Sequence, residues 1–142
     1  MANSKYDVTA IGNAIVDVLA HAEDKFLNDQ KLTKGAMSLI DPPTADRLYS
    51  LMNPGVEASG GSAANTVAGL AGLGGKAAFI GKVANDQLGQ VFSHDIRAVG
   101  VDFDTAPLTN GTTTARCLIF VTPDAQRTMQ TFLGACVDLG PE

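Results

Sequence analysis

The sequence predicts an α/β protein in which helices alternate with strands, with a β-hairpin region near the C-terminus standing apart from these layers. Two observations carry this prediction. β-rich runs and runs with helical spacing of apolar residues alternate from residue 6 to residue 102. Further on, two strand-like runs are joined by the turn sequence TPDAQ. The composition, 45% hydrophobic and 18% charged over 142 residues, is typical of one globular domain.

The first strands and the first helix follow in order. YDVTAIG, residues 6–12, is a β-rich run that stops at a glycine, and AIVDVLAHA, residues 14–22, alternates as a second strand. EDKFLNDQKL, residues 23–32, predicts a short helix that ends before Gly35. AMSLID, residues 36–41, then predicts a third strand.

Two longer helices and a buried strand come next. DPPTADRLYSLM, residues 41–52, has prolines where a first helical turn tolerates them and apolar residues on one face. KAAFIGKV, residues 76–83, is apolar enough for a buried strand. NDQLGQVFSHDIRAVG, residues 85–100, predicts a helix with Gly100 at the left-handed C-cap position. Its apolar stripe consists of Leu88, Val91, Phe92, Ile96 and Val99.

The residues from Val101 onward have a β texture. Asn110-Gly111 is the expected turn before the two runs that flank TPDAQ. Cys117 lies in one of these runs, and the other cysteine, Cys136, stands in no CxxC spacing with it. A small buried side chain is therefore favoured at Cys117 over a disulfide or metal role.

Charge and hydropathy exclude several classes of protein. The formal net charge is −5 and the ten basic residues are scattered, which argues against a surface for nucleic acid or anionic membranes. No run approaches the roughly 18 apolar residues of a membrane span. The N-terminal run MANSKYD has no apolar segment of a leader, so a cytoplasmic protein is expected.

The paired glycines Gly60 and Gly61 stand between the strand-like VEAS and a helix that begins near Ser62. Such a turn has free backbone N–H groups, and a substrate can approach it without meeting a Cβ. On the first helical turn, Asn65 offers a donor and an acceptor, which suits a neutral polyol better than a phosphate. The alternative is an ordinary glycine turn with Ser62 as the N-cap and Asn65 at the surface.

Two better-known glycine motifs are excluded. The Walker A pattern needs Gly-Lys-Ser/Thr opening a helix, whereas Gly75-Lys76-Ala77 follows one and lacks the hydroxyl. The dinucleotide fingerprint needs GxGxxG after the first strand, and IGNAIVD has a single glycine there. Neither a P-loop nor a Rossmann site is predicted.

Asp17 is the second candidate for ligand binding. It follows the Gly12-Asn13 break in an otherwise apolar run, AIVDVLA, where a carboxylate is costly to bury unless something bonds to it. A carboxylate is a good acceptor for adjacent hydroxyls, so Asp17, Asn65 and the Gly61 N–H are a plausible clamp for a sugar diol. The alternative is an edge-strand residue turned to solvent.

Taken together, these motifs resemble the ribokinase-like sugar and nucleoside kinases, also called the phosphofructokinase-B family. The resemblance rests on GN with Asp17, on GGSAAN with Gly74 at the family's spacing, and on GKVANDQLG after the next strand. LNDQ, GGSAANT and TPDAQRTM are similar to the adenosine-kinase-like branch. The resemblance covers residues 1–142, which correspond to the first half of a family member.

The resemblance implies a three-layer α/β core, of which residues 1–142 form the N-terminal part, with a small β-sheet lid. The lid strands are expected at approximately 14–22, 36–41 and 101–134. Gly60 and Gly61 would be the hinge of the lid. Asn13, Asp17, Gly61 and Asn65 would bind the hydroxyls of the substrate.

Arg127, after the TPDAQ turn, would by the same resemblance approach the transferring phosphate; the alternative is a solvated surface charge. The implied reaction is ATP- and Mg²⁺-dependent phosphotransfer to a primary hydroxyl of an adenosine-like nucleoside or of a sugar. The general base, the metal ligands and the nucleotide site would lie beyond Glu142. The 142 residues alone are therefore expected to be inactive.

A function of another class is also considered. The 142 residues could form a non-catalytic binding or dimerisation module in which an exposed edge such as CLIFV pairs with a second copy. A homodimer through the lid sheet would then be expected.

Overall fold

The computed structural model describes residues 4–141 of the chain, which divides into two compact units. The first three residues of the run MANSKYD lie outside the described residues. Unit 1 comprises Met1–Val16, Ala58–Ala115 and Leu133–Glu142, and unit 2 comprises Asp17–Glu57 and Arg116–Phe132. No helix among residues 4–141 is long and apolar enough to cross a membrane.

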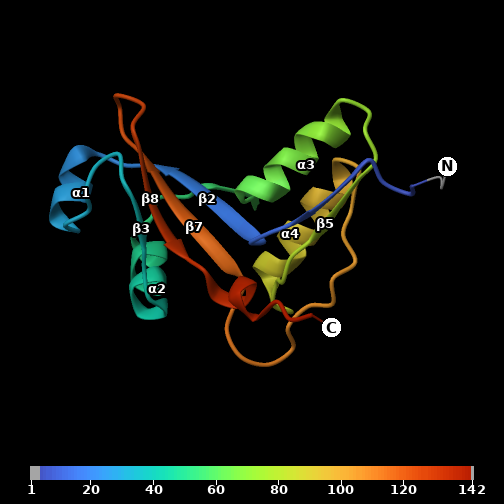
Figure 1. Cartoon of the computed structure of the whole chain (residues 1–142). Coiled ribbons are helices and arrows are strands. Elements are labelled where there is room, and N and C mark those ends of the chain that lie inside the picture. The colour runs from blue at the N-terminus through green and yellow to red at the C-terminus, as the bar shows by residue number, and fades with distance from the viewer. Residues whose placement is uncertain (1–3, 142) are drawn as a thin grey trace. The chain divides into compact units, whose positions relative to one another are not determined.

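Unit 1 contains a three-stranded parallel sheet. Figure 1 shows its strand β5 together with the helices α3 and α4. The strand order is β1-β5-β6, and α3 contacts β1 and β5 while α4 contacts β6. The elements are β1 (Val8–Ile11), α3 (Ser62–Gly72), β5 (Ala77–Ile80), α4 (Gln87–Ala98), β6 (Val101–Asp102) and the short 3-10 helix η1 (Gly134–Asp138).

Three aromatic rings form the centre of unit 1. Phe79 of β5, Phe92 of α4 and Phe103 are each at most 1% exposed, and their ring centroids lie 5.3 to 5.9 Å apart. Tilted and edge-to-face pairs of this kind stabilise a core beyond their buried area. The helical stripe predicted for residues 85–100 thus packs through Phe92 on Phe79 of the buried strand predicted at residues 76–83. Ile96 of the same stripe is also buried.

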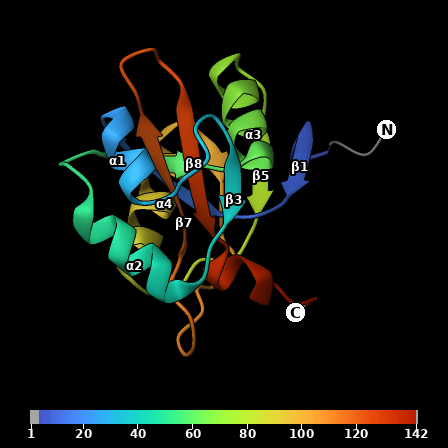
Figure 2. The ribbon, with the colours of Figure 1, turned by 90° about the vertical axis from the view of Figure 1, so that its left-hand side faces the viewer.

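Unit 2 is built on a five-stranded sheet with the order β3-β8-β7-β2-β4. Figure 2 shows β3 beside the β7–β8 hairpin, which is antiparallel with Val121 opposite Arg127. The hairpin predicted around TPDAQ is therefore confirmed. The elements are β2 (Ile15–His21), α1 (Asp24–Asp29), β3 (Met37–Leu39), α2 (Pro42–Leu51), β4 (Val56–Gly60), β7 (Ala115–Val121) and β8 (Arg127–Phe132).

Helix ends agree with the signals in the sequence. Asp41 caps α2 by accepting a hydrogen bond from the Thr44 N–H at 2.9 Å, ahead of the two prolines of the first turn. Gly100 has φ +93° directly after the C-cap of α4, which confirms the predicted left-handed position. Cys117 and Cys136 are both free and buried, as expected for a small apolar side chain at Cys117.

The strand pairing bears on three expectations about the sheets. β6 pairs with β5 in the three-stranded sheet, whereas β7 and β8 lie in the five-stranded sheet, so the strands expected in the range 101–134 do not share one sheet. β4, which the prediction left out, is part of the five-stranded sheet. CLIFV is not an edge either, because β7 lies between β8 and β2. The argument for a homodimer through that edge is therefore wrong.

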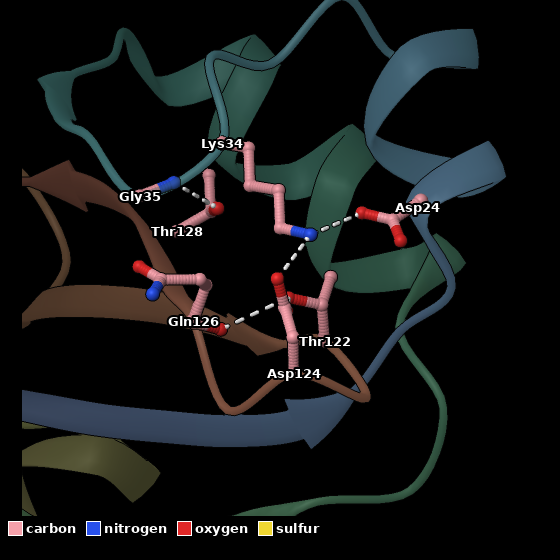
Figure 3. A network of polar contacts seen from close by, with 7 residues as sticks. All are labelled: Asp24, Lys34, Gly35, Thr122, Asp124, Gln126 and Thr128. Carbon is pink, nitrogen blue, oxygen red and sulfur yellow. Dashed lines mark hydrogen bonds and ion pairs between the residues drawn. The ribbon is translucent and has the colours of Figure 1, made fainter.

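A polar network ties the turn of the β7–β8 hairpin to the segment after α1 (Figure 3). Lys34 Nζ lies 2.6 Å from Asp24 Oδ1 and 2.7 Å from Asp124 Oδ2. Thr122 Oγ1 donates a hydrogen bond to Asp124 Oδ1 at 2.7 Å. The hydrogen bonds from Lys34 and Thr122 lower the pKa of Asp124 to about 2.

We expect Asp124 to make unfolding depend on pH between about pH 4 and about pH 2. Because its pKa is lower in the folded state, the unfolded chain takes up the proton first as the pH falls, and the stabilisation is lost. In denaturant unfolding of the full-length protein, Asp124→Asn should flatten the fall in unfolding free energy across this window. Lys34→Gln, which removes a partner that lowers the pKa of Asp124, should flatten this fall in the same way. Equal slopes for Asp124→Asn and the wild type would contradict the assignment.

Candidate substrate-binding site

The turn at Gly60 and Gly61 joins β4 to α3 in unit 1. Gly61 is the N-cap of α3, with φ +100° and ψ 140°, a backbone conformation that residues with a Cβ rarely adopt. A Cβ on Gly61 would lie 2.5 Å from the carbonyl oxygen of Asn13. The predicted glycine turn is confirmed, and Ser62 is not the N-cap because it already lies inside the helix.

The first turn of α3 and the loop after β1 lie against each other. A Cβ on Gly12 would lie 2.8 Å from the Cβ of Ala63, so this contact also depends on a glycine. Asn13 and Asn65 are both exposed. Unit 1 therefore brings together Asn13, Gly61 and Asn65, three of the four residues predicted to bind substrate hydroxyls.

The helix end at this position is open to a ligand. The first N–H groups of a helix have no partner within it, and Gly61 contributes no side chain to cap them. The exposed amide of Asn65 stands one turn further along, where it can donate and accept. Two neutral amides beside free N–H groups are suited to hydroxyl groups.

Asp17, the fourth predicted residue, lies in unit 2 near the middle of β2. β2 is flanked by β7 and β4, so the edge-strand alternative for Asp17 is wrong. Its side chain is half-buried, and burial raises the pKa of its carboxyl group while the charge of Arg127 opposes that rise. Among the described residues of unit 2, no hydrogen bond to the Asp17 carboxylate is formed.

Arg127 is the first residue of β8 and is exposed. Within the described part of unit 2 it forms no ion pair at 4.0 Å or less, although its charge acts on Asp17. The clamp of Asp17 with Asn65 and Gly61 draws on both units, and it stays a prediction, as does the role of Arg127.

Apolar side chains form a strip on the sheet of unit 2 that carries Asp17. Cys117 and Ile119 share one face of β7. Burial raises the pKa of the Cys117 thiol, and the charge of Asp17 adds to this rise. Met129 of β8 stands opposite Ile119, and Met37 of β3 stands opposite Met129. Met37 is 56% exposed. Met37 was not predicted as a site residue. The alternation within AMSLID is the only feature of the sequence that places it on one face of a strand.

The predicted site residues coincide with neither a metal cluster nor the cavity of unit 1. Among residues 4–141, no group of three or more His, Cys, Asp or Glu side chains could hold a metal ion. A cavity of about 680 Å³ in unit 1 lies beside α4, and none of the predicted site residues lines it. The site is therefore defined by the predicted residues rather than by a closed cavity.

The sequence as a whole is similar to kinases of small molecules. A model of the pfkB family of carbohydrate kinases matches residues 37–142. The chain belongs to this family. The crystal structure of an adenosine kinase from Sinorhizobium meliloti is 61% identical with a TM-score of 0.89, and the match covers 97% of this chain and 42% of that one.

Two further proteins show the range of similarity. A probable sugar kinase from Rhizobium etli is 57% identical with a TM-score of 0.89, over 96% of this chain and 42% of that chain. A probable fructokinase-3 from Arabidopsis thaliana is 29% identical over 106 residues, which are 74% of this chain and 31% of that protein. The chain thus spans about a third to two fifths of the length of these proteins.

The comparisons confirm the resemblance inferred from the motifs. The mixed α/β fold with two sheets agrees with the ribokinase-like class. A non-catalytic binding module finds no support, because the similar proteins are named as kinases.

Proposed function

We propose that the full protein containing this chain transfers the γ-phosphate of ATP to a primary hydroxyl of an adenosine-like nucleoside. The observation that carries the proposal is the 61% identity to an adenosine kinase over 97% of this chain, which exceeds the 57% identity to a probable sugar kinase and the 29% identity to a probable fructokinase. In this proposal the chain supplies acceptor-binding residues from both units.

Acceptor binding is proposed to use groups that match ribose hydroxyls. Asp17 provides carboxylate oxygens that no neighbour in the described part of unit 2 occupies, and a diol can donate to both. Asn13 and Asn65 provide neutral amides, and Gly61 provides a backbone N–H. A half-buried carboxylate with vacant acceptor positions gains most from a ligand that donates hydrogen bonds.

The base is proposed to lie on the apolar strip of unit 2. Met129 and Ile119 are opposite each other on the sheet, and exposed Met37 continues the strip. Methionine is flexible and polarisable and makes favourable contacts with flat aromatic rings. A free sugar has no comparable surface to cover this strip.

Arg127 is proposed to stabilise the transferring phosphoryl group. A guanidinium group presents fixed N–H donors that match phosphate oxygens, and charge stabilisation of this kind is a large part of phosphoryl-transfer catalysis. In this proposal ATP would supply the phosphoryl group and Mg²⁺ would neutralise its charge. The nucleotide site, the metal ligands and the general base are proposed to lie in the remainder of the full protein, since this chain matches 42% of the length of the adenosine kinase.

An acceptor panel tests the proposal with the full-length protein and radiolabelled ATP. We expect kcat/KM for adenosine to exceed the values for ribose, fructose and a ketodeoxy sugar by a large factor, because only the nucleoside carries a base for the apolar strip. Met129→Ala should raise the KM for adenosine and leave that for ribose unchanged. A sugar that outpaces adenosine would overturn the nucleoside assignment, and the absence of transfer to every acceptor would overturn the kinase assignment.

A further inference from the structure

The chain passes between its two units four times, after Val16, Glu57, Ala115 and Phe132. Each passage, called a crossing here, has one end in unit 1. The hydrogen bonds and close contacts described below for these unit 1 ends are made within unit 1. At two of the four ends, the partner is a carboxylate of the helix α4 or of its N-cap.

Asp86 forms the first of these contacts. As the N-cap of α4 it accepts a hydrogen bond from the Gly89 N–H at 2.8 Å, and its carboxylate also accepts from Thr114 N at 2.9 Å and from Thr114 Oγ1 at 2.7 Å. Thr114 is fully buried and stands immediately before Ala115, the last residue of unit 1 at the third crossing. An N-cap needs only one hydrogen bond to the first turn of its helix, so the two bonds to Thr114 are not needed for capping α4.

Glycine at position 89 allows this arrangement. A Cβ on Gly89 would lie 2.0 Å from the carbonyl oxygen of Ala84, and the Ala84 N–H donates to Thr114 Oγ1 at 2.9 Å. The motif GKVANDQLG thus brings Ala84, Asp86 and Gly89 around one threonine. Bonds to an ionised carboxylate are about twice as strong as those between neutral groups, so this threonine is held firmly.

Asp95 forms the second contact from the same helix. Its Oδ2 accepts a hydrogen bond from the Ser59 N–H at 3.1 Å. Ser59 is the second residue of unit 1 after the crossing at Glu57, and it directly precedes the Gly60-Gly61 turn. One helix therefore binds the second and the third crossing through two carboxylates.

The other two crossings are joined to these. The Ala135 N–H donates to the Thr113 carbonyl at 2.8 Å, which links the fourth crossing to the third. The backbone of Gly61 lies against the Asn13 carbonyl, which links the second crossing to the first. All four unit 1 ends are thereby connected to α4, directly or through one neighbour.

We propose that α4 is the anchor of the crossings, and that Asp86 and Asp95 are positioning residues for the acceptor-binding residues of unit 2. The anchor consists of Asp86 with Thr114 and of Asp95 with Ser59. The positioning role rests on the proposed function, whereas the anchor itself does not. Asp17 is the first residue of unit 2 after a crossing, so freedom at the crossings reaches a proposed acceptor ligand directly.

Substitutions in the full-length protein can separate the anchor from helix capping. In Asp86→Asn, the amide oxygen still caps α4 through Gly89, but its NH₂ group faces the Thr114 N–H and cannot accept from it. Asp95→Ala removes the bond to Ser59, whereas Asp95→Asn keeps an oxygen that can accept it. Asp41→Asn is the matched control, because Asp41 caps α2 without contacting a crossing.

Amide hydrogen exchange is the first readout and does not depend on activity. We expect exchange at Thr114 to rise about tenfold in Asp86→Asn, and exchange at Ser59 to rise similarly in Asp95→Ala and return in Asp95→Asn. Exchange in β5 should stay at the wild-type rate. Wild-type exchange at Ser59 in Asp95→Ala, or at Thr114 in a folded Asp86→Asn, would overturn the anchor.

Kinetics are the second readout. We expect Asp86→Asn and Asp95→Ala to lower kcat/KM for the acceptor about tenfold while the KM for ATP changes less than about twofold. Asp95→Asn and Asp41→Asn should behave as the wild type. Faster exchange with unchanged acceptor kinetics would overturn the positioning role. A wild-type protein that phosphorylates no acceptor would overturn the proposed function instead, and the exchange data would still decide the anchor.

Discussion

Replacing Asp17 by alanine is expected to weaken acceptor binding about 10- to 150-fold, with ATP binding nearly unchanged. This loss of affinity corresponds to a binding free energy of about 1.5–3 kcal/mol, the contribution of hydrogen bonds from buried hydroxyls to a charged partner. Asp17→Asn keeps one acceptor oxygen and should fall between alanine and the wild type. Calorimetric titration of the full-length protein with adenosine measures the effect, and unchanged affinity in Asp17→Ala would remove Asp17 from the site.

Stability should distinguish a ligand-binding role of Asp17 from a structural one. Burial raises the pKa of Asp17 in the folded state, so as the pH rises the unfolded chain releases the proton first, and folding loses stability through this window. At neutral pH the carboxylate therefore destabilises the fold, and Asp17→Asn should unfold at a higher denaturant concentration than the wild type. Asp29→Asn, at an exposed carboxylate of the same unit, is the control.

Much of the fold could be predicted because its signals are local. The helix caps at Asp41 and Gly100 and the turn at TPDAQ are determined by residues within a few positions of each other. Membership of a sheet is different, because it depends on partners far along the chain. β6 has only two residues, and its pairing with Ala77 and Ala78 could not be inferred from VDFDTAP.

The same division holds for the candidate site. The conformation of Gly61 follows from a strand-to-helix turn with paired glycines, so the sequence was sufficient to predict it. Predicting that Asp17 lies on an inner strand would have required the strand order, because an edge strand and an inner strand can carry the same residues. The bonds of Asp86 to Thr114 could not be inferred from the motif GKVANDQLG, because Thr114 lies 28 residues away.

Replacing Gly61 by alanine is expected to lower the unfolding free energy by at least about 2 kcal/mol, since a non-glycine residue in this backbone region costs about 1–3 kcal/mol before any clash. The clash adds to it, because the new Cβ would lie 2.5 Å from the Asn13 carbonyl oxygen, which is backbone and cannot rotate away. Asn13 must then shift, and acceptor affinity should fall together with stability.

The control for Gly61→Ala lies in the same helix. A Cβ on Gly69 of α3 meets nothing within 4 Å, and alanine is the better helix former, so Gly69→Ala should raise the unfolding free energy by about 0.5–1 kcal/mol. If the backbone of Gly61 is the constraint, denaturant unfolding gives changes in unfolding free energy of opposite sign for the two variants. Titration with adenosine then shows a loss of affinity in Gly61→Ala alone. If Gly61→Ala keeps wild-type stability and affinity, the close approach of α3 to Asn13 is not a requirement of the site.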